Sequence, residues 1–181
     1  MSTLLRYYRH CPVMMMLHIV GVLIAWIAPI DVLGRYPALR SLVLFIDEIF
    51  PVVNSAAGRS AFPEVTGLYF SVMYASMPLR VFDGVRFAYF ERNYTLGKIR
   101  ASMRSRIGVS ISIPFLLCFG VVALTFGRPY YEINVFPISE SRFLLGLVGP
   151  IFAGGMEAFG MSVGLVWTYI FLSWMCSKLR G

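Results

Sequence analysis

The chain has few charged residues for its length. Only 14% of its 181 residues are Asp, Glu, Lys or Arg, whereas 58% are hydrophobic. Soluble domains carry about 25% charged residues, so this composition excludes an ordinary water-exposed surface. The mean hydropathy of +0.73 points the same way. We therefore expect lipid to be the solvent for much of the chain.

Histidine and cysteine are also scarce. The two histidines are His10 and His18, and the three cysteines are Cys11, Cys118 and Cys176. An odd number of cysteines without a C-x-x-C pair, in or beside apolar runs, indicates small apolar residues rather than a disulfide or metal framework. A bis-histidine haem is excluded because no other apolar run carries a partner for His18. We expect no cofactor and no metal.

Long apolar runs are abundant. A spanning helix needs about 20 apolar residues to cross about 30 Å of hydrocarbon. The run 143–176 is too long for one perpendicular helix, so we expect a break at Gly154-Gly155, with 143–153 as a half-helix or interfacial segment. Pro114 predicts a kink in the third run. The sequence thus predicts a single all-α membrane domain, a bundle of four transmembrane helices with one or two interfacial helices. The predicted spans are 11–30, 61–79, 107–126 and 155–176.

The basic residues test this topology. With the N-terminus inside, the inner side carries eleven of them and the outer side five, as the positive-inside rule requires. Both termini are then cytoplasmic, and a bacterial inner membrane is the expected location. The inner set is Arg6, Arg9, Arg80, Arg86, Arg92, Lys98, Arg100, Arg104, Arg106, Lys178 and Arg180. The outer set is Arg35, Arg40, Arg59, Arg128 and Arg142.

Two connecting stretches have amphipathic patterns at helical spacing. In 40–50, Arg40, Asp47 and Glu48 share one face, which predicts a helix on the outer leaflet or a lid over the bundle. In 80–91, Arg80 and Asp83 fall on the polar face of a predicted inner interfacial helix. The inner basic loop that follows either attracts anionic lipid or only fixes topology. Its residues are Lys98, Arg100, Arg104 and Arg106. No nucleic-acid partner is expected, because basic charge alone reads no bases.

The stretch "GPIFAGGMEAFGMSVGLVW" contains both G-x-S-x-G and G-x-x-x-G. A serine nucleophile needs a histidine, but at 1.5 Å per residue Ser162 lies roughly 21 Å and His18 roughly 10 Å above the inner boundary. We therefore expect no enzyme, and interpret the stretch as a helix-packing surface, within the bundle or against a partner. The packing residues are Gly154, Gly155, Gly160, Gly164 and Thr168.

Two carboxylates in the apolar runs raise the question of an ion path. Glu157, counted from Cys176, lies roughly 28 Å up, and Glu64, counted from Arg80, roughly 24 Å up. Together with Asp31 they predict one outer polar layer, with Arg128 among its cations. One interpretation of that layer is a set of salt bridges between helix ends. The other is a vestibule that attracts cations, or a polar patch on which another membrane protein docks. His18, deep in the first span, is expected to hydrogen-bond a Ser or Tyr of a neighbouring helix.

The sequence supports three functions. The first is a non-enzymatic membrane protein that associates laterally with another integral membrane protein, as an accessory subunit or an inhibitor. The methionines Met14, Met15 and Met16 offer an adaptable surface for such contact or for core packing. The second is a small channel or transporter whose mouth is the acidic outer layer.

The third function comes from a resemblance. The segments "FPVVNS" (50–55) and "FGRP" (126–129), with the chain length, the four spans, the long first outer loop and the basic second loop, resemble immunity proteins against pore-forming colicins of the A and B type. The resemblance implies a protein that blocks the pore-forming helices of a toxin within a bacterial inner membrane. It implies no particular functional residue here.

Overall fold

The computed structural model describes residues 10–126 and 136–179, and these residues are helical with no strand among them, which confirms the all-α prediction. The bounds of the helices are α2 (Pro12–Ile27), α3 (Val32–Arg35), α4 (Pro37–Ile49), α5 (Val52–Ala57), α6 (Pro63–Ala75), α7 (Met77–Phe90), α8 (Arg92–Ala101), α9 (Met103–Phe126), α10 (Arg142–Phe152) and α11 (Gly155–Leu179).

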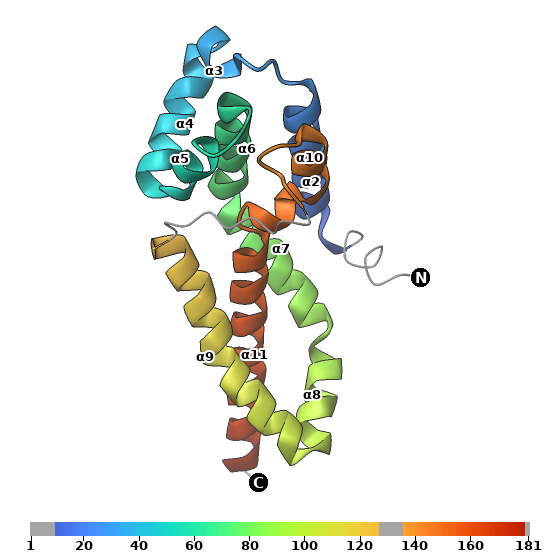
Figure 1. Ribbon diagram of the computed structural model, residues 1–181. Coiled ribbons are helices and arrows are strands. Elements are labelled where there is room, and N and C mark those ends of the chain that lie inside the picture. The colour runs from blue at the N-terminus through green and yellow to red at the C-terminus, as the bar shows by residue number, and fades with distance from the viewer. Residues whose placement is uncertain (1–9, 127–135, 180–181) are drawn as a thin grey trace.

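The helices form two halves stacked end to end (Figure 1). In the first half, α2 packs against α10 and α6, and α4 and α5 cover the other side of α6. In the second half, α11 packs against α9 and α7, and α8 packs against α9. The consecutive pairs α6–α7 and α10–α11 run from one half into the other. The four predicted spans therefore do not stand side by side, because α2 lies beside α6 and α10 instead of along the length of α9 and α11.

One helical stretch in the described part of the chain, Arg142–Ser177, is long and apolar enough to cross a membrane; Pro12–Ile27 is apolar but shorter. The predicted span 61–79 is divided between α6 and α7. Pro78 causes this division, since it has no N–H to donate to the carbonyl of Tyr74. The next helix, α7, begins with a hydrogen bond from the N–H of Arg80 to the carbonyl of Ser76.

The α10–α11 stretch also breaks, between Phe152 and Gly155. Gly154 has φ +79°, the left-handed conformation that often ends a helix and that glycine adopts without strain. The N–H of Ala153 donates to the carbonyl of Gly149, which closes the last turn of α10. The two breaks, at Ser76 and Gly154, lie beside each other, since an added Cβ at Gly154 would meet Met77 and Arg80.

The central helix of the first half is α6, which is buried along most of its length. Tyr69, Phe70 and Met73 are fully buried, and Tyr69 lies between Gly21 of α2 and Gly149 of α10, where a Cβ would collide with its ring. Glycines thus let α2 and α10 approach a large aromatic side chain. A smaller core in the second half consists of Ile99, Val109, Val166 and Ile170.

The predicted amphipathic helix 40–50 falls within α4, which packs against α6. Ile46 is buried, and Val43 packs against the core, while Phe45 and Ile49 remain exposed. This arrangement corresponds to the expected lid over α6. Asp47 accepts a hydrogen bond from the N–H of Asn54 (2.9 Å) and so caps the next helix, α5.

Candidate functional site

The beginning of α2 is capped by a carboxylate from α7. Asp83 is fully buried, and its Oδ2 accepts hydrogen bonds from the N–H groups of Val13 (2.8 Å) and Met14 (3.2 Å). Those N–H groups belong to the first turn of α2, where no intrahelical partner exists. Cys11 occupies the N-cap position of α2 but does not cap that helix. Its thiol S–H instead donates to the carbonyl of Asp83 (3.5 Å). The carboxylate of Asp83 therefore holds α2 against α7.

The end of α2 is capped by a guanidinium from α10. Arg142 donates from Nε to the carbonyl of Ala25 and from Nη2 to the carbonyl of Ala28, both at 2.5 Å. Beside it, the ring of Trp26 stacks on Phe143 with 5.4 Å between centroids, and Trp26 donates to the carbonyl of Phe143 (3.4 Å). Both ends of α2 are thus tied to distant helices by a charge of the sign that stabilises that end of the helix dipole.

Arg80 joins the two helix breaks. It is 1% exposed, and its guanidinium donates to the carbonyls of Ala153 (2.5 Å), Pro150 (2.6 Å) and Met73 (3.3 Å). The first two are carbonyls that the break after α10 leaves without intrahelical partners. Gly155 gives the room for this contact, because a Cβ there would lie 3.0 Å from Nη2 of Arg80. The guanidinium replaces the missing helical hydrogen bonds in an apolar interior.

The expected solvent-facing polar face of 80–91 is therefore wrong at Arg80 and Asp83. Arg80 and Asp83 are buried in α7, and Arg86 extends outward from the same helix with an exposed side chain, 3.7 Å from Asp83. Amphipathic spacing placed these charges together but could not distinguish a solvated face from a face that caps other helices. One signal was available: α2 begins at Pro12 and the residue directly before it is Cys11, not Ser, Thr, Asp or Asn, so the cap had to come from elsewhere.

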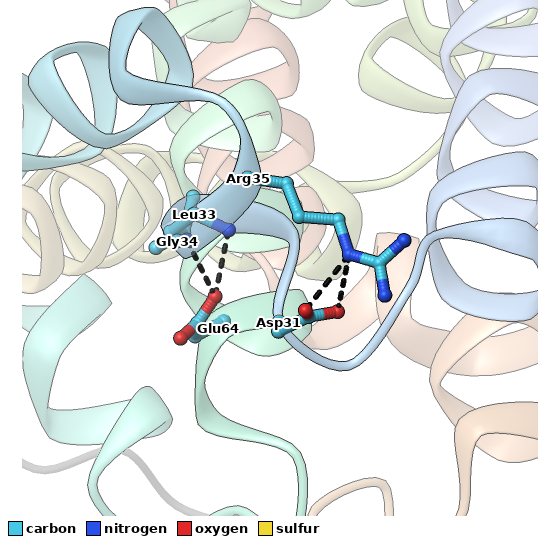
Figure 2. Close-up of polar contacts among 5 residues, drawn as sticks. All are labelled: Asp31, Leu33, Gly34, Arg35 and Glu64. Carbon is cyan, nitrogen blue, oxygen red and sulfur yellow. Dashed lines mark hydrogen bonds and ion pairs between the residues drawn. The ribbon is translucent and has the colours of Figure 1, made fainter.

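Glu64 caps the short helix α3. Its Oε2 accepts hydrogen bonds from the N–H groups of Leu33 (2.6 Å) and Gly34 (3.1 Å), as Figure 2 shows. Beside it, Asp31 forms an exposed ion pair with Arg35 at 2.8 Å. The hydrogen bond from Arg35 holds the pKa of Asp31 below its usual value. Glu64 and Asp31 do lie near one another, and Glu64 uses one of its two carboxylate oxygens to cap α3.

Glu157 does not share that layer. It lies in the first turn of α11, within electrostatic range of Arg80 and Tyr74. Glu64 is sixteen residues from Arg80 along α6–α7, which is roughly 24 Å at 1.5 Å per residue. The expected layer took Arg80 as the inner end of its span, whereas Arg80 lies beside Gly155, at the level of Glu157. Its Oε2 is buried and finds no hydrogen-bond partner among the described residues. Arg128, also assigned to the layer, lies outside the described residues.

Ser162 is a packing residue. It is fully buried where α11 crosses α7, and its Oγ donates to the carbonyls of Ala158 (2.6 Å) and Val81 (3.0 Å). Gly84 of α7 faces it, and an added Cβ on that glycine would lie 2.8 Å from Cβ of Ser162. The hydroxyl is thus turned toward backbone carbonyls, and the G-x-S-x-G pattern marks a close crossing of two helices.

Replacing Ser162 by Ala is expected to lower the free energy of unfolding by about 1 kcal/mol, the usual contribution of one hydrogen bond, and to leave function intact. Thermal unfolding in detergent measures the first effect. Ser162→Val, which adds a methyl group against α7, is the comparison and should cost about 1–3 kcal/mol. Loss of function in a stable Ser162→Ala variant would contradict the packing role.

The G-x-x-x-G face of α11 is used by the chain itself. A Cβ at Gly160 would lie 3.4 Å from the carbonyl oxygen of Leu116, and one at Gly164 would lie 2.9 Å from Leu117 Cδ2, both on α9. Thr168 continues this region and donates its Oγ1 to the carbonyl of Gly164 (2.7 Å). Of the two packing alternatives, the structure therefore assigns these glycines to the intramolecular contact between α9 and α11.

The remaining predicted residues lie at different sites. His18 of α2 lies close to the backbone of Leu147 in α10, and its expected hydrogen bond to a Ser or Tyr of a neighbouring helix stays a prediction. The inner basic loop is helical, at the α8–α9 turn, where Lys98, Arg100 and Arg104 are exposed. Arg106 instead caps α8 by donating to the carbonyl of Ile99 (2.9 Å) and lies over the ring of Trp174, 5.4 Å from its centroid.

An apolar groove of about 830 Å³ lies beside the paired breaks, where α2 and α10 meet α9 and α11. Among the described residues its lining is apolar apart from His18 and Arg80. Sequence reasoning did not find this groove, because its walls come from six helices that are far apart in the chain. Its lining is Met14, Leu17, His18, Met73, Arg80, Phe115, Leu116, Phe119, Leu147, Pro150, Ile151, Gly155, Met156, Phe159 and Gly160.

Comparisons with models of protein families, with curated proteins and with solved structures find no match to this chain.

Proposed function

We propose that this chain is a non-enzymatic membrane protein that acts by lateral association with another integral membrane protein. The observation that carries the proposal is that large apolar side chains are exposed on helices of both stacked halves, on α2 in the first and on α9 and α11 in the second. The bilayer covers the side chains that lie within it. The remainder needs a protein partner, because large apolar patches are not left in water.

The dimensions support this reasoning. Arg106 beside Trp174 marks the basic end of the second half, and from Trp174 to Gly155 α11 rises roughly 28 Å, about one hydrocarbon thickness. Beyond that level, α2 adds on the order of 20 Å in the first half. We propose that the second half crosses the membrane, with its basic end in the cytoplasm, and that the outer face of α2 contacts the partner. In this placement α2 begins at the opposite interface, so it replaces the first span that was expected to start from the cytoplasmic side.

The outer face of α2 is suited to a partner helix. Its exposed side chains repeat at helical spacing, and its flexible methionines adapt to irregular surfaces. Capping at both ends by Asp83 and Arg142 fixes the orientation of α2 relative to α7 and α10. The exposed residues on this face are Met15, Met16, Ile19, Leu23, Trp26 and Ile27.

Photo-crosslinking in the native membrane tests the proposal. A photoreactive phenylalanine analogue replaces Ile19, and the matched control replaces Ile111, an equally apolar and exposed residue on α9. We expect Ile19 to give one discrete adduct with another membrane protein and Ile111 to give lipid adducts. An adduct with a second copy of this chain, or no protein adduct from Ile19, would overturn the proposal.

The inhibitor form of this function is an immunity protein in a bacterial inner membrane, as the resemblance implies. In that form the partner is the pore-forming segment of a colicin. Expression in a sensitive strain should then raise the colicin dose needed for killing, and the Ile19 adduct should appear only after toxin is added. The accessory-subunit form predicts an adduct without toxin and no protection.

A small transporter is the second candidate, favoured by the pairing of two broken helices. Broken helices of transporters form substrate sites at their interruptions, and here Arg80 and Glu157 lie at such a place. This candidate places its site at the two breaks, and Glu64 of the expected acidic mouth caps α3 with one carboxylate oxygen. Ion flux in liposomes that is abolished by Glu157→Gln would favour transport over partner binding.

A further inference from the structure

We propose that the α8–α9 turn binds the phosphate headgroups of anionic phospholipids in the cytoplasmic leaflet. The binding surface, named here the basic surface, consists of Lys98 and Arg100 of α8 and Arg104 of α9. The inference rests on the proposed membrane placement of the second half, and it is independent of the partner at α2. It decides between the two roles expected of the basic loop, which were attraction of anionic lipid and the fixing of topology alone.

The charge of the basic surface is not balanced by the protein. Its three side chains are exposed, and among the residues that the structure describes no carboxylate forms an ion pair with them. The reason lies in the sequence, because no Asp or Glu occurs between Arg92 and Phe126, the range that covers α8 and α9, and none follows Glu157 in α11. Like charges held in one turn repel one another, so an anion from outside the chain stabilises them.

These cations also have no structural task in the turn. The neighbouring Arg106 shows what such a task looks like, since it caps α8 at the carbonyl of Ile99 (2.9 Å) and lies over the ring of Trp174. Arg100 and Arg104 donate no side-chain hydrogen bond to any described residue. Their guanidinium groups carry only donors, and a phosphate oxygen is the acceptor that such donors bind best.

The basic surface lies at the level of the lipid phosphates. The bond from Arg106 to Ile99 places Lys98 and Arg100, the neighbours of Ile99, beside the level of Trp174. Trp174 is roughly 28 Å along α11 from Gly155, about the thickness of the hydrocarbon core. The α8–α9 turn lies at the end of the second half where α11 also ends (Figure 1), so it reaches beyond the hydrocarbon into the headgroups.

Exposed apolar side chains border the basic surface. Tyr94 and Met103 are 63% and 65% exposed, and Nζ of Lys98 lies 4.5 Å from the centroid of the Tyr94 ring. Tyrosine beside basic residues is typical of a membrane interface, where the ring lies at the headgroups and the charges meet anionic lipid. A soluble phosphate would leave Met103 in water, whereas a phospholipid covers both kinds of side chain.

The test uses the full-length protein in nanodiscs that contain equal amounts of phosphatidylglycerol and phosphatidylcholine. Native mass spectrometry after release from the nanodiscs counts the lipids that the protein retains. Each basic residue near an anionic surface contributes about a fivefold preference, so we expect phosphatidylglycerol to be retained at least about twenty-five-fold over phosphatidylcholine. Equal retention of the two lipids would overturn the proposal.

Two double variants locate the site. Arg100→Gln with Arg104→Gln should lower the preference about twenty-five-fold, because two charges are lost. Arg40→Gln with Arg59→Gln removes two exposed charges from the first half and should leave the preference unchanged. Thermal unfolding confirms that both variants are folded, and the comparison of lipids on the unmodified protein needs no variant. An equal effect of the two double variants would overturn the location.

A competition experiment separates a lipid from a soluble anion. Glycerol phosphate added to the nanodiscs should leave the retained ratio as it is in chloride at equal ionic strength, because the lipid is also held by the apolar border. A lower ratio in glycerol phosphate would overturn the lipid as the ligand.

The crosslinking experiment at Ile111 distinguishes a failure of this inference from a failure of the proposed function. Lipid adducts at Ile111 report that the second half lies in the bilayer, whether or not α2 has a partner. If those adducts form and both lipids are retained equally, the lipid preference alone is overturned. If Ile111 gives no lipid adduct, the proposed placement is overturned together with this inference.

Discussion

Replacing Arg80 by Met is expected to lower the free energy of unfolding by about 3–5 kcal/mol. The substitution leaves the buried carbonyls of Pro150 and Ala153 without donors and leaves Glu157 without its compensating cation. Arg80→Lys should recover part of the loss, because an ammonium keeps the charge but cannot reach several carbonyls in the fixed geometry of a guanidinium.

Thermal or denaturant unfolding in detergent, followed by circular dichroism, measures this effect. Arg100→Met is the control: it removes the same charge at an exposed position of α8, so we expect a change within about 0.5 kcal/mol. Equal stability of the Arg80→Met and Arg100→Met variants would show that the buried guanidinium does not hold the breaks together.

Replacing Gly164 by Leu is expected to destabilise the protein by about 1–3 kcal/mol, or to prevent folding. Gly164 faces α9, and even a Cβ there would lie 2.9 Å from the side chain of Leu117 and 3.4 Å from its backbone nitrogen. Because no space remains, the larger side chain has to push α9 away from α11 and so reduces the packing of small residues that holds helices together in lipid.

Gly108→Leu in α9 is the control for Gly164→Leu, since a Cβ at that helical glycine meets nothing within 4 Å. We expect it to be neutral or slightly stabilising, as leucine has the higher helix propensity. If the Gly164→Leu variant were as stable as the Gly108→Leu variant and lost only its binding to a partner, the glycine would belong to an intermolecular interface.

The local features of the fold were predictable where a single residue type decides the backbone. Gly154-Gly155 predicted the break before α11, and glycine at φ +79° terminates α10 there. The apolar runs predicted helices, and the small residues of α11 predicted close packing of another backbone. The division of 61–79 was missed because Pro78 was counted as part of a continuous span, although it removes a hydrogen bond from that helix.

The roles of the charged residues were not predictable from spacing. Asp83, Arg142, Glu64 and Arg80 each satisfy backbone groups of a helix that is distant in the chain. A periodic pattern reports only which residues share a face of one helix. It carries no information on which helix end will approach that face, so buried caps and solvated charges have the same pattern.

By itself, the amino-acid sequence determined that this protein is helical and apolar, since composition and 3.6-residue periodicity act within each segment. Only the tertiary structure shows that the two halves stack end to end and that the glycines of α11 pack against α9. It also shows the groove beside the breaks of α6–α7 and α10–α11. The physical reason is the range of the interactions. Helix propensity is local, whereas buried charges and carbonyls find their partners across the whole chain, wherever water and lipid cannot satisfy them.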